Sequence, residues 1–336
     1  MAEELLFALG TYTTLGGPGI RIFSLEGNEF RVHADTYAED PIYLLRDRGE
    51  AYLYAVCGGE GPQEGWAASF APKDGDWKNG LEALDRRMCG AVCPCHLCIA
   101  DGDLITGEYA DGCISVFPLE NGRVGERKQL IRHTGHGAHP VRQTCAHVHQ
   151  VLPFGADFLC MEHGEDRIIR YTKRNGEWTE KSEVRLAPGK APRHGLVYGY
   201  RLYVVTELGS TLQVYDISGS EWTLMQELSL PTAVPEINFP AALRLLPDGK
   251  GLCASSRGAD KISFFAFDGD GSLIRRGEAD VRGHWPRDIL PLADGRVLVT
   301  NQKTGNVALL GRDRKDCWAL LANMQVSAPV ALLQLK

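Results

Sequence analysis

Short runs in which apolar and polar residues alternate recur along almost the whole chain. Clear examples are Gly19–Phe23, Cys113–Phe117 and Thr211–Tyr215, in which alternate residues are apolar. A period of two places apolar side chains on one face of a β-strand. Asp-Gly pairs such as Asp248-Gly249 separate several runs, and this pair favours a tight hairpin turn. Because no segment has a sustained helical period, the pattern predicts an all-β protein.

A repeating unit of 43 to 53 residues organises these strands. Each unit opens with a proline or an alanine, followed by an apolar run, a turn, a second strand that ends in small or polar residues, and a third strand. Repeats of this length with four short strands are typical of β-propeller blades. We predict a single domain over residues 1–336, an all-β, seven-bladed β-propeller with four-stranded blades. The seven openings are Pro41, Pro94, Ala146, Pro192, Pro240, Pro286 and Pro329.

The two ends of the chain each hold only part of a repeat. The last opening is followed by Pro329–Lys336 alone, and residues 1–40 supply the rest of a unit. We therefore expect the ring to close through a blade shared between the N- and C-termini. The segment Cys57–Trp77 departs most from the repeat, and we interpret it as a distorted blade with long loops. A pair of β-sandwiches or a β-solenoid is the alternative, but neither accounts for seven phased openings.

Propeller geometry also predicts where a site would form. The first strand of each blade lines the central channel and the second runs back antiparallel to it. Residues at the openings and residues 14 to 17 positions later should therefore meet at one mouth of the channel. A single polar residue at a strand end is usually solvated, so the prediction depends on several sharing one repeat phase. Those at the openings are His96, His147, Arg193, His194 and Arg287, and those near second-strand ends are Glu108, Tyr109, Glu162, His163, Glu207, Arg257 and Gln302.

Short motifs along the chain also carry a family resemblance, through their order and spacing. They are Gly10–Thr13, Gln143–His147, Pro192–His194, Thr206–Glu207, Ser255–Gly258, Pro286–Arg287 and Asn301–Gln302. The chain resembles the lactonase family with a seven-bladed propeller fold, which includes bacterial 6-phosphogluconolactonases and the fungal carboxy-cis,cis-muconate lactonising enzyme. The resemblance implies a catalytic set of one histidine, two arginines and one glutamate, which falls on His147, Arg193, Arg257 and Glu207.

Three positions beside these motifs depart from the family pattern. Ala191, Thr206 and Ser256 stand where the family has glycine, asparagine and asparagine. These changes alter polar contacts near the predicted site, whereas the four charged or titratable residues remain.

The residue types fit the opening of a lactone by water, without a metal or another cofactor. Arginine binds phosphate or carboxylate through two parallel hydrogen bonds. We expect Arg193 and Arg257 to divide substrate anchoring and oxyanion stabilisation, while either Glu207 or His147 activates water and the other orients it or protonates the leaving oxygen. The expected substrate is a small anionic lactone of the 6-phosphogluconolactone type. Further contacts to it are expected from Arg142, Gln143, His194, Arg287 and Gln302.

Two other functions are compatible with the sequence. A muconate-type lactonising enzyme, a cycloisomerase, would use a similar four-residue set. A non-enzymatic interaction scaffold would instead expose an apolar patch on one face. The charged residues at the openings favour an enzyme over a scaffold.

The sequence contains two groups of potential metal ligands. Cys93, Cys95, His96 and Cys98 are ligand types that zinc accepts, but successive residues of an extended strand point to opposite faces. We expect these cysteines to be core residues. His133, His136 and His139 are expected to be mostly solvated residues of a loop over the basin.

Composition narrows the partners and the location. The formal net charge of −7 argues against nucleic acid or an anionic membrane as a partner. No run approaches the roughly 20 apolar residues of a membrane helix, and the acidic N-terminus does not resemble a signal peptide. We expect a cytoplasmic protein whose ten cysteines are reduced, and a monomer or weak homo-oligomer.

Overall fold

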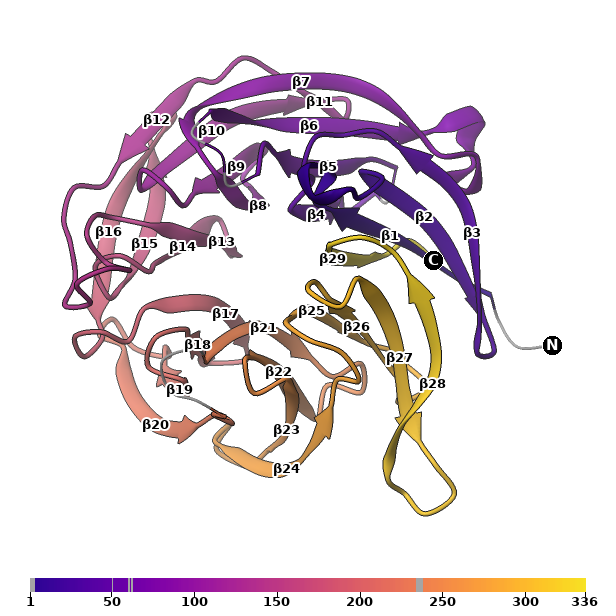
Figure 1. Cartoon of the computed structure of the whole chain (residues 1–336). Helices are drawn as coiled ribbons and strands as arrows, with labels where there is room; N and C mark the ends of the chain where they lie inside the picture. Colours follow the sequence, from indigo (N-terminus) through magenta and orange to yellow (C-terminus); the bar gives the residue numbers. More distant parts are fainter. Residues whose placement is uncertain (1–3, 50, 60, 62, 234–237) are drawn as a thin grey trace. The chain divides into compact units, whose positions relative to one another are not determined.

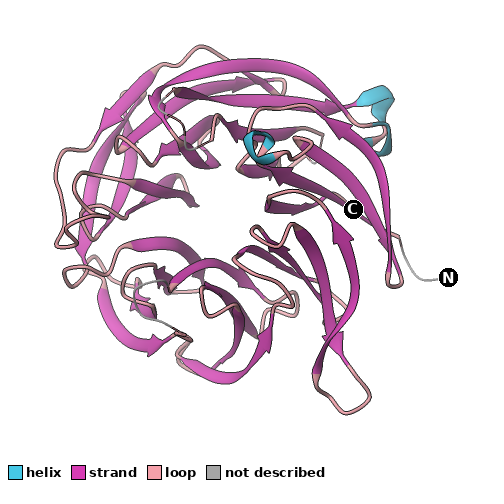
Figure 2. Cartoon of the chain, in the orientation of Figure 1, coloured by secondary structure: helices cyan, strands magenta, loops and turns pink. Residues whose placement is uncertain are grey.

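Nearly all regular structure in the computed structural model is β-strand. It describes residues 4–49, 51–59, 61, 63–233 and 238–336. Within these residues, helix is confined to three short 3₁₀ turns, η1 (Thr13–Leu15), η2 (Lys73–Gly75) and η3 (Trp77–Asn79) (Figure 2). The chain forms two compact units, residues 1–189 with 330–336, and residues 190–329. The single domain expected over residues 1–336 therefore stays a prediction.

The first unit contains four antiparallel sheets, each of which has the strand order of a propeller blade (Figure 1). The terminal sheet is β29 (Pro329–Gln334), β1 (Leu5–Thr11), β2 (Ile20–Glu26) and β3 (Glu29–Thr36). The next is β4 (Tyr43–Arg46), β5 (Leu53–Cys57), β6 (Glu64–Pro72) and β7 (Leu81–Val92). The third is β8 (Pro94–Ala100), β9 (Asp103–Glu108) and β10 (Cys113–Glu120), with β11 (Arg123–Val124) and β12 (Gln129–Arg132) both paired to β10. The fourth is β13 (Val148–Phe154), β14 (Asp157–Glu162), β15 (Arg167–Arg174) and β16 (Glu177–Arg185).

The second unit contains three sheets of the same kind. The first sheet is β17 (Pro192–Tyr198), β18 (Arg201–Thr206), β19 (Thr211–Asp216) and β20 (Thr223–Ser229). The second is β21 (Phe239–Leu245), β22 (Gly251–Arg257), β23 (Lys261–Phe267) and β24 (Leu273–Asp280). The third is β25 (Pro286–Pro291), β26 (Val297–Asn301), β27 (Asn306–Arg312) and β28 (Trp318–Gln325). Neighbouring blades share apolar cores, such as Tyr203 and Val205 with Leu252 and Phe265. Third strands such as β23 are buried on both faces, which explains why their alternation is weak in the sequence.

The chain ends share one sheet, as predicted. β29 lies beside β1, and the backbone N–H of Leu6 donates to the carbonyl of Lys336 at 3.0 Å. The segment that we expected to be a distorted blade supplies β6, which pairs with both β5 and β7. Its irregularities are the 3₁₀ turns η2 and η3 and two register shifts in the pairing of β6 with β7.

The innermost strands of four blades begin with a β-bulge, and this feature positions their polar residues. Pairing with the second strand skips one residue in β8, β13, β17 and β25. A bulge leaves the extra residue outside the ladder and redirects its side chain. The skipped residues are Cys95, His149, Arg193 and Arg287.

This register corrects one of the predicted openings. β13 begins at Val148, which pairs with Glu162 at the end of the second strand. The opening Pro192 pairs with Thr206 in the same way. The opening of this repeat is therefore Val148 rather than Ala146. His147 therefore precedes the strand, and His149 has the repeat phase of Arg193. The sequence alone does not reveal a bulge, so the alignment of this repeat was displaced.

Within a blade, the opening and the end of the second strand meet, as predicted. The residue after the second strand donates its backbone N–H to the carbonyl of the residue before the first strand. This bond joins His163 to His147 and Glu207 to Ala191, each at 2.8 Å. Side chains from both positions are thereby fixed at one end of each blade.

Candidate functional site

Three of the predicted catalytic residues form a buried ionic group in the second unit. Glu207 Oε2 lies 2.9 Å from Arg193 Nε and 2.7 Å from Arg257 Nη2. All three residues are nearly inaccessible, with exposed fractions of 2%, 2% and 7% for Arg193, Glu207 and Arg257. Two guanidinium groups and one carboxylate give this arginine–glutamate group a net charge of +1.

The backbone of three strands holds this arginine–glutamate group in position. Arg193 occupies the bulge of β17, and its Nη1 donates to the carbonyl of Ala241 at 2.8 Å. Arg257 ends β22, and its Nε donates to the carbonyl of Phe239 at 2.9 Å. Glu207 follows β18 directly. Because both arginines are fixed by main-chain carbonyls as well as by Glu207, their orientation is set before any ligand binds.

Trp285 lies beside this group and was missed by the sequence reasoning. Its ring centroid is 5.4 Å from the Arg257 guanidinium carbon and 3.3 Å from Lys303 Nζ, and Phe239 meets it edge-on at 5.9 Å. Its φ is +69°, a backbone conformation that is costly for a bulky residue and that clusters at functional sites. The position directly before an opening proline was a signal that could have found it.

The other predicted substrate contacts of the second unit lie at the same blade ends. His194 Nε2 is 3.1 Å from Arg193 Nη1. Arg287 is half-buried in the bulge of β25. Gln302 is half-buried after β26 and donates its backbone N–H to the carbonyl of Trp285 at 3.1 Å.

His147, the fourth predicted catalytic residue, lies in the first unit. Its Nδ1 donates to the carbonyl of Tyr109, and its ring stacks on the Tyr109 ring at a centroid distance of 4.4 Å. A histidine that donates from Nδ1 carries its lone pair on Nε2 when neutral. That atom is 3.7 Å from Cys145 Sγ. Burial lowers the pKa of His147, so the neutral form prevails near pH 7.

Two further histidines lie near His147. His149 and His163 are both buried, with ring centroids 6.0 Å apart, and each meets Tyr109, at 5.5 and 5.4 Å. His163 was predicted from its place after a second strand, whereas His149 was not counted as a site residue. The repeat phase that it shares with Arg193 was the signal for it.

Glu108 and Glu162 end their second strands, as predicted, but they point into the protein interior. Both are fully buried, and burial raises the pKa of each to about 8. Glu162 accepts backbone N–H groups from His147 and Glu165. It therefore supports the segment that carries His147.

The loop before β13 holds the two remaining predicted substrate contacts. Arg142 Nη2 donates to the Tyr109 hydroxyl at 3.2 Å. Gln143 is buried, and its Nε2 donates to the carbonyl of His163 and to Asp166 at 2.8 and 2.9 Å. Its Oε1 accepts the backbone N–H of His139 at 3.0 Å. These bonds give Gln143 a role in shaping the loop.

The cysteine segment of β8 is part of the interior, and the predicted histidine loop is only partly solvated. Cys93, Cys95 and Cys98 are buried, and the Cys95 thiol points at the main-chain carbonyls of Val148 and His149. His136 is exposed, as expected, but His133 has an exposed fraction of only 8%. The expectation of a solvated His133 was wrong because this residue packs against Tyr171.

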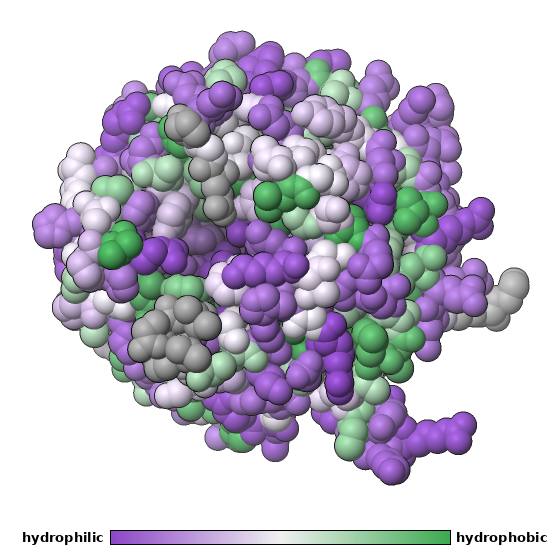
Figure 3. All heavy atoms as spheres, in the orientation of Figure 1, coloured by the Kyte–Doolittle hydropathy of each residue, from purple (hydrophilic) through white to green (hydrophobic). Residues whose placement is uncertain are grey.

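Apolar side chains on the surface are scattered rather than clustered. Figure 3 shows mostly hydrophilic residues on the face in view, with apolar side chains in small separate groups. Among the described residues, no helix is long and apolar enough to span a membrane. Large exposed apolar residues include Leu15, Tyr37, Val141 and Tyr200.

Comparison with known proteins identifies the family. Residues 6–333 match the family described as "Lactonase, 7-bladed beta-propeller". The chain is 28% identical to a 6-phosphogluconolactonase of Bacillus subtilis, covering 96% of this chain and 95% of the relative. It is similar to the crystal structure of a putative 6-phosphogluconolactonase from Bacteroides fragilis, with a TM-score of 0.89, 25% identity and 98% of each chain covered. The Pseudomonas aeruginosa periplasmic gluconolactonase PpgL shares the fold, with a TM-score of 0.88, 23% identity and 99% of each chain covered.

The family match extends over almost the whole chain. It confirms the expected fold class, an all-β protein with seven four-stranded blades. This chain therefore belongs to the seven-bladed β-propeller lactonase family.

Proposed function

We propose that this protein is a hydrolase of small anionic sugar-acid lactones of the 6-phosphogluconolactone class. The observation that carries the proposal is the buried arginine–glutamate group of Arg193, Glu207 and Arg257, with its excess positive charge. The naming of the Bacillus subtilis and Bacteroides fragilis proteins supports the substrate class.

The arginine–glutamate group is suited to an anion rather than to a neutral ligand. A guanidinium presents five N–H donors in a rigid plane, which matches the oxygens of phosphate, carboxylate or a developing oxyanion. An anion that contacts the group would balance its +1 charge. Donors that are fixed before the reaction also lower the barrier, because no reorganisation is needed as charge develops on the lactone oxygen.

Glu207 is assigned to holding the two arginines. Its Oε2 contacts both guanidinium groups, at 2.9 and 2.7 Å. An oxygen that already accepts a charge-assisted hydrogen bond from Arg257 and forms an ion pair with Arg193 is a poor candidate for taking a proton from water. This assignment leaves the role of general base to another residue.

His147 is proposed as that general base. The carbonyl of Tyr109 binds Nδ1–H, so the lone pair resides on Nε2, which can remove a proton from water. The hydroxide equivalent adds to the lactone carbonyl carbon, and the tetrahedral intermediate then expels the ring oxygen. The imidazolium formed in the first step returns its proton to that oxygen, so the histidine is regenerated.

The test is the hydrolysis of 6-phosphogluconolactone by the wild type and by the variants Arg193→Ala and Arg257→Ala. Removal of one oxyanion or anchoring donor typically costs about 10²–10³-fold in rate, so we expect each variant to lose at least 100-fold in kcat/KM. Arg276→Ala is the matched control because Arg276 is exposed on β24 of the same unit. Undiminished turnover in both Arg193→Ala and Arg257→Ala would refute the proposal.

Two further compounds test the substrate specificity. Gluconolactone without a phosphate should be opened with a higher KM if an arginine binds the phosphate group. A carboxy-muconate substrate should keep its absorbance, and its bleaching by the wild type would identify a lactonising enzyme instead.

A further inference from the structure

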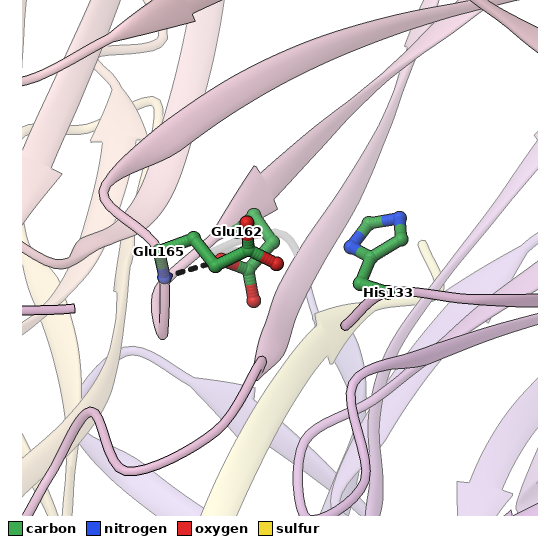
Figure 4. Close-up of side chains that lie close together, drawn as sticks. All are labelled: His133, Glu162 and Glu165. Carbon is green, nitrogen blue, oxygen red and sulfur yellow. Dashed lines mark hydrogen bonds between the residues drawn. The ribbon is translucent and has the colours of Figure 1, made fainter. Parts of the chain in front are cut away.

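A histidine and two glutamates lie together in the first unit, away from the arginine–glutamate group. His133 belongs to the loop after β12, Glu162 ends β14, and Glu165 lies in the following turn. One potential ligand atom from each residue lies within 4.8 Å of the others. Figure 4 shows the His133 ring facing the two carboxylates, with one nitrogen directed toward them.

Hydrogen bonds around His133 determine which of its nitrogens carries the lone pair. The Tyr171 hydroxyl donates to Glu180 Oε1 at 3.3 Å, so its oxygen accepts from His133 Nε2 at 2.7 Å. The single proton of the neutral ring therefore lies on Nε2. Nδ1 is then an acceptor, and within the described part of the chain it has no hydrogen-bond partner. Since His133 is only 8% exposed, water does not readily replace that partner.

The two carboxylates that face Nδ1 also present acceptors. Glu165 Oε2 binds Arg167 Nη1 at 3.1 Å, while its buried Oε1 has no hydrogen-bond partner among the described residues. The Glu162 carboxylate accepts backbone N–H groups from His147, Gly164 and Glu165, and a carboxylate has about four lone-pair sites, so one stays available. Three groups with lone pairs therefore surround one small space.

We propose that His133 Nδ1 and one oxygen each of Glu162 and Glu165 bind a divalent transition-metal ion. One imidazole with two carboxylates suits zinc or manganese, whereas calcium and magnesium prefer all-oxygen sites. Metal–ligand bonds of about 2.1 Å join ligand atoms no more than about 4.2 Å apart. The side chains need to move together by less than about 1 Å to bind such an ion.

The bound ion has a structural role. It connects the loop after β12 to the turn between β14 and β15. Glu162 also accepts the backbone N–H of His147, so the ion would stiffen the segment on which His147 lies. The inference does not depend on the proposed lactonase activity, because the ion takes no part in the reaction.

The experiment measures metal binding and thermal stability of the full chain. The purified protein is treated with EDTA, desalted and titrated separately with ZnCl₂ and MnCl₂ in a calorimeter, and its metal content after dialysis is measured by mass spectrometry. We expect one ion per chain for at least one of the two metals, and a rise in Tm of several degrees on its addition, since a ligand that binds only the folded state stabilises it.

The variants Glu165→Gln and His133→Ala test the ligands. Each should weaken binding by at least tenfold and abolish the rise in Tm, whereas His136→Ala, in the exposed part of the same loop, should behave as the wild type. If His133→Ala fails to fold, Glu165→Gln alone decides the result, because an amide preserves the shape of that side chain. The proposal is overturned if the wild type binds neither ion, or if Glu165→Gln binds as tightly as the wild type.

Discussion

Glu207 is the single residue on which the arginine–glutamate group depends most. Glu207→Gln leaves two buried guanidinium groups without a counter-charge, and breaking a buried ion pair in this way costs about 3–5 kcal/mol. We expect urea unfolding to show a loss of that size, together with a loss of lactonase activity. The measurement is the free energy of unfolding at pH 7.

Glu227→Gln is the matched control for this prediction. Glu227 pairs with Lys190 at 2.7 Å in the same unit, but its side chain is 34% exposed. Exposed pairs contribute about 0–1 kcal/mol, so this variant should lose much less stability than Glu207→Gln. Equal losses in the two variants would show that Glu207 is no more important than a surface ion pair.

The protonation of His147 should govern the acid side of the pH–rate profile. Its pKa is lowered by burial, so the base form persists below the ordinary histidine pKa of about 6.5. We expect kcat/KM to stay constant from pH 8 to about pH 6.5 and to fall only in more acidic solution. In His147→Gln the rate should be about 10²–10⁴-fold lower and this acid limb should vanish.

The exposed His136 provides the control for that profile. His136→Gln should keep both the rate and the acid limb of the wild type. An acid limb that persists unchanged in His147→Gln would assign the titration to another group.

The sequence identified the charged residues of the site better than their surroundings. Arg193, Glu207 and Arg257 were expected to meet because each occupies the same end of a blade, and they do. The burial of His133 and the contacts of Trp285 could not be inferred, because they depend on which residues of other strands and loops lie next to them. Residue type and repeat phase are local properties, whereas burial is a property of the tertiary structure.

At the scale of elements, the buried carboxyl of Glu108 at the end of β9 should lower the stability of the fold as the pH rises. Burial raises the pKa of Glu108 from the ordinary 4.5 to about 8. Below about pH 4.5 both the folded and the unfolded chain hold this proton, so it has no effect on stability. Between about pH 4.5 and 8 the unfolded chain loses the proton first, so the free energy of unfolding falls as pH rises through that window.

The variant Glu108→Gln removes this titration. We expect it to be more stable than the wild type by a few kcal/mol at pH 8.5, and close to the wild type at pH 4. Glu120→Gln, exposed on the adjacent β10, should show no such pH-dependent difference. The measurement is urea unfolding at both pH values, and a constant difference between wild type and Glu108→Gln would contradict the expected sign.

Strands could be predicted where neighbouring residues alternate between apolar and polar. Third strands such as β2, β10 and β19 lie where alternating residues predicted them. The bulges were not predictable, because an extra residue in a strand leaves the hydrophobic pattern nearly unchanged while moving one side chain out of the ladder. Because the bulge in β13 was not foreseen, the sequence pattern placed the opening at Ala146 instead of Val148, and the repeat position of His149 was assigned wrongly.

At the scale of the whole chain, the two ends depend on each other. β29 is the innermost strand of a sheet whose other three strands come from the first 36 residues. Leu335 also donates its backbone N–H to the carbonyl of Leu6 at 2.7 Å. Deletion of residues 329–336 would expose the ladder edge of β1 and uncover apolar neighbours such as Ala8, which packs in the same core as Ala331 and Leu335.

Circular permutation separates the need for this pairing from the need for the natural chain order. A short linker from Lys336 to Glu4, in place of residues 1–3, would make β29 and β1 consecutive strands, and new ends can be opened at the exposed Asp248–Gly249 turn. The β29–β1 pair becomes local while the β21–β22 pair becomes long-range, so the entropy of loop closure changes little. We therefore expect this permutant to fold with a Tm near that of the wild type. The truncated chain should instead unfold at least 10 °C lower or fail to fold. Circular dichroism melts of the three proteins decide the matter, and a truncated chain as stable as the permutant would mean that the shared blade does not secure the ends.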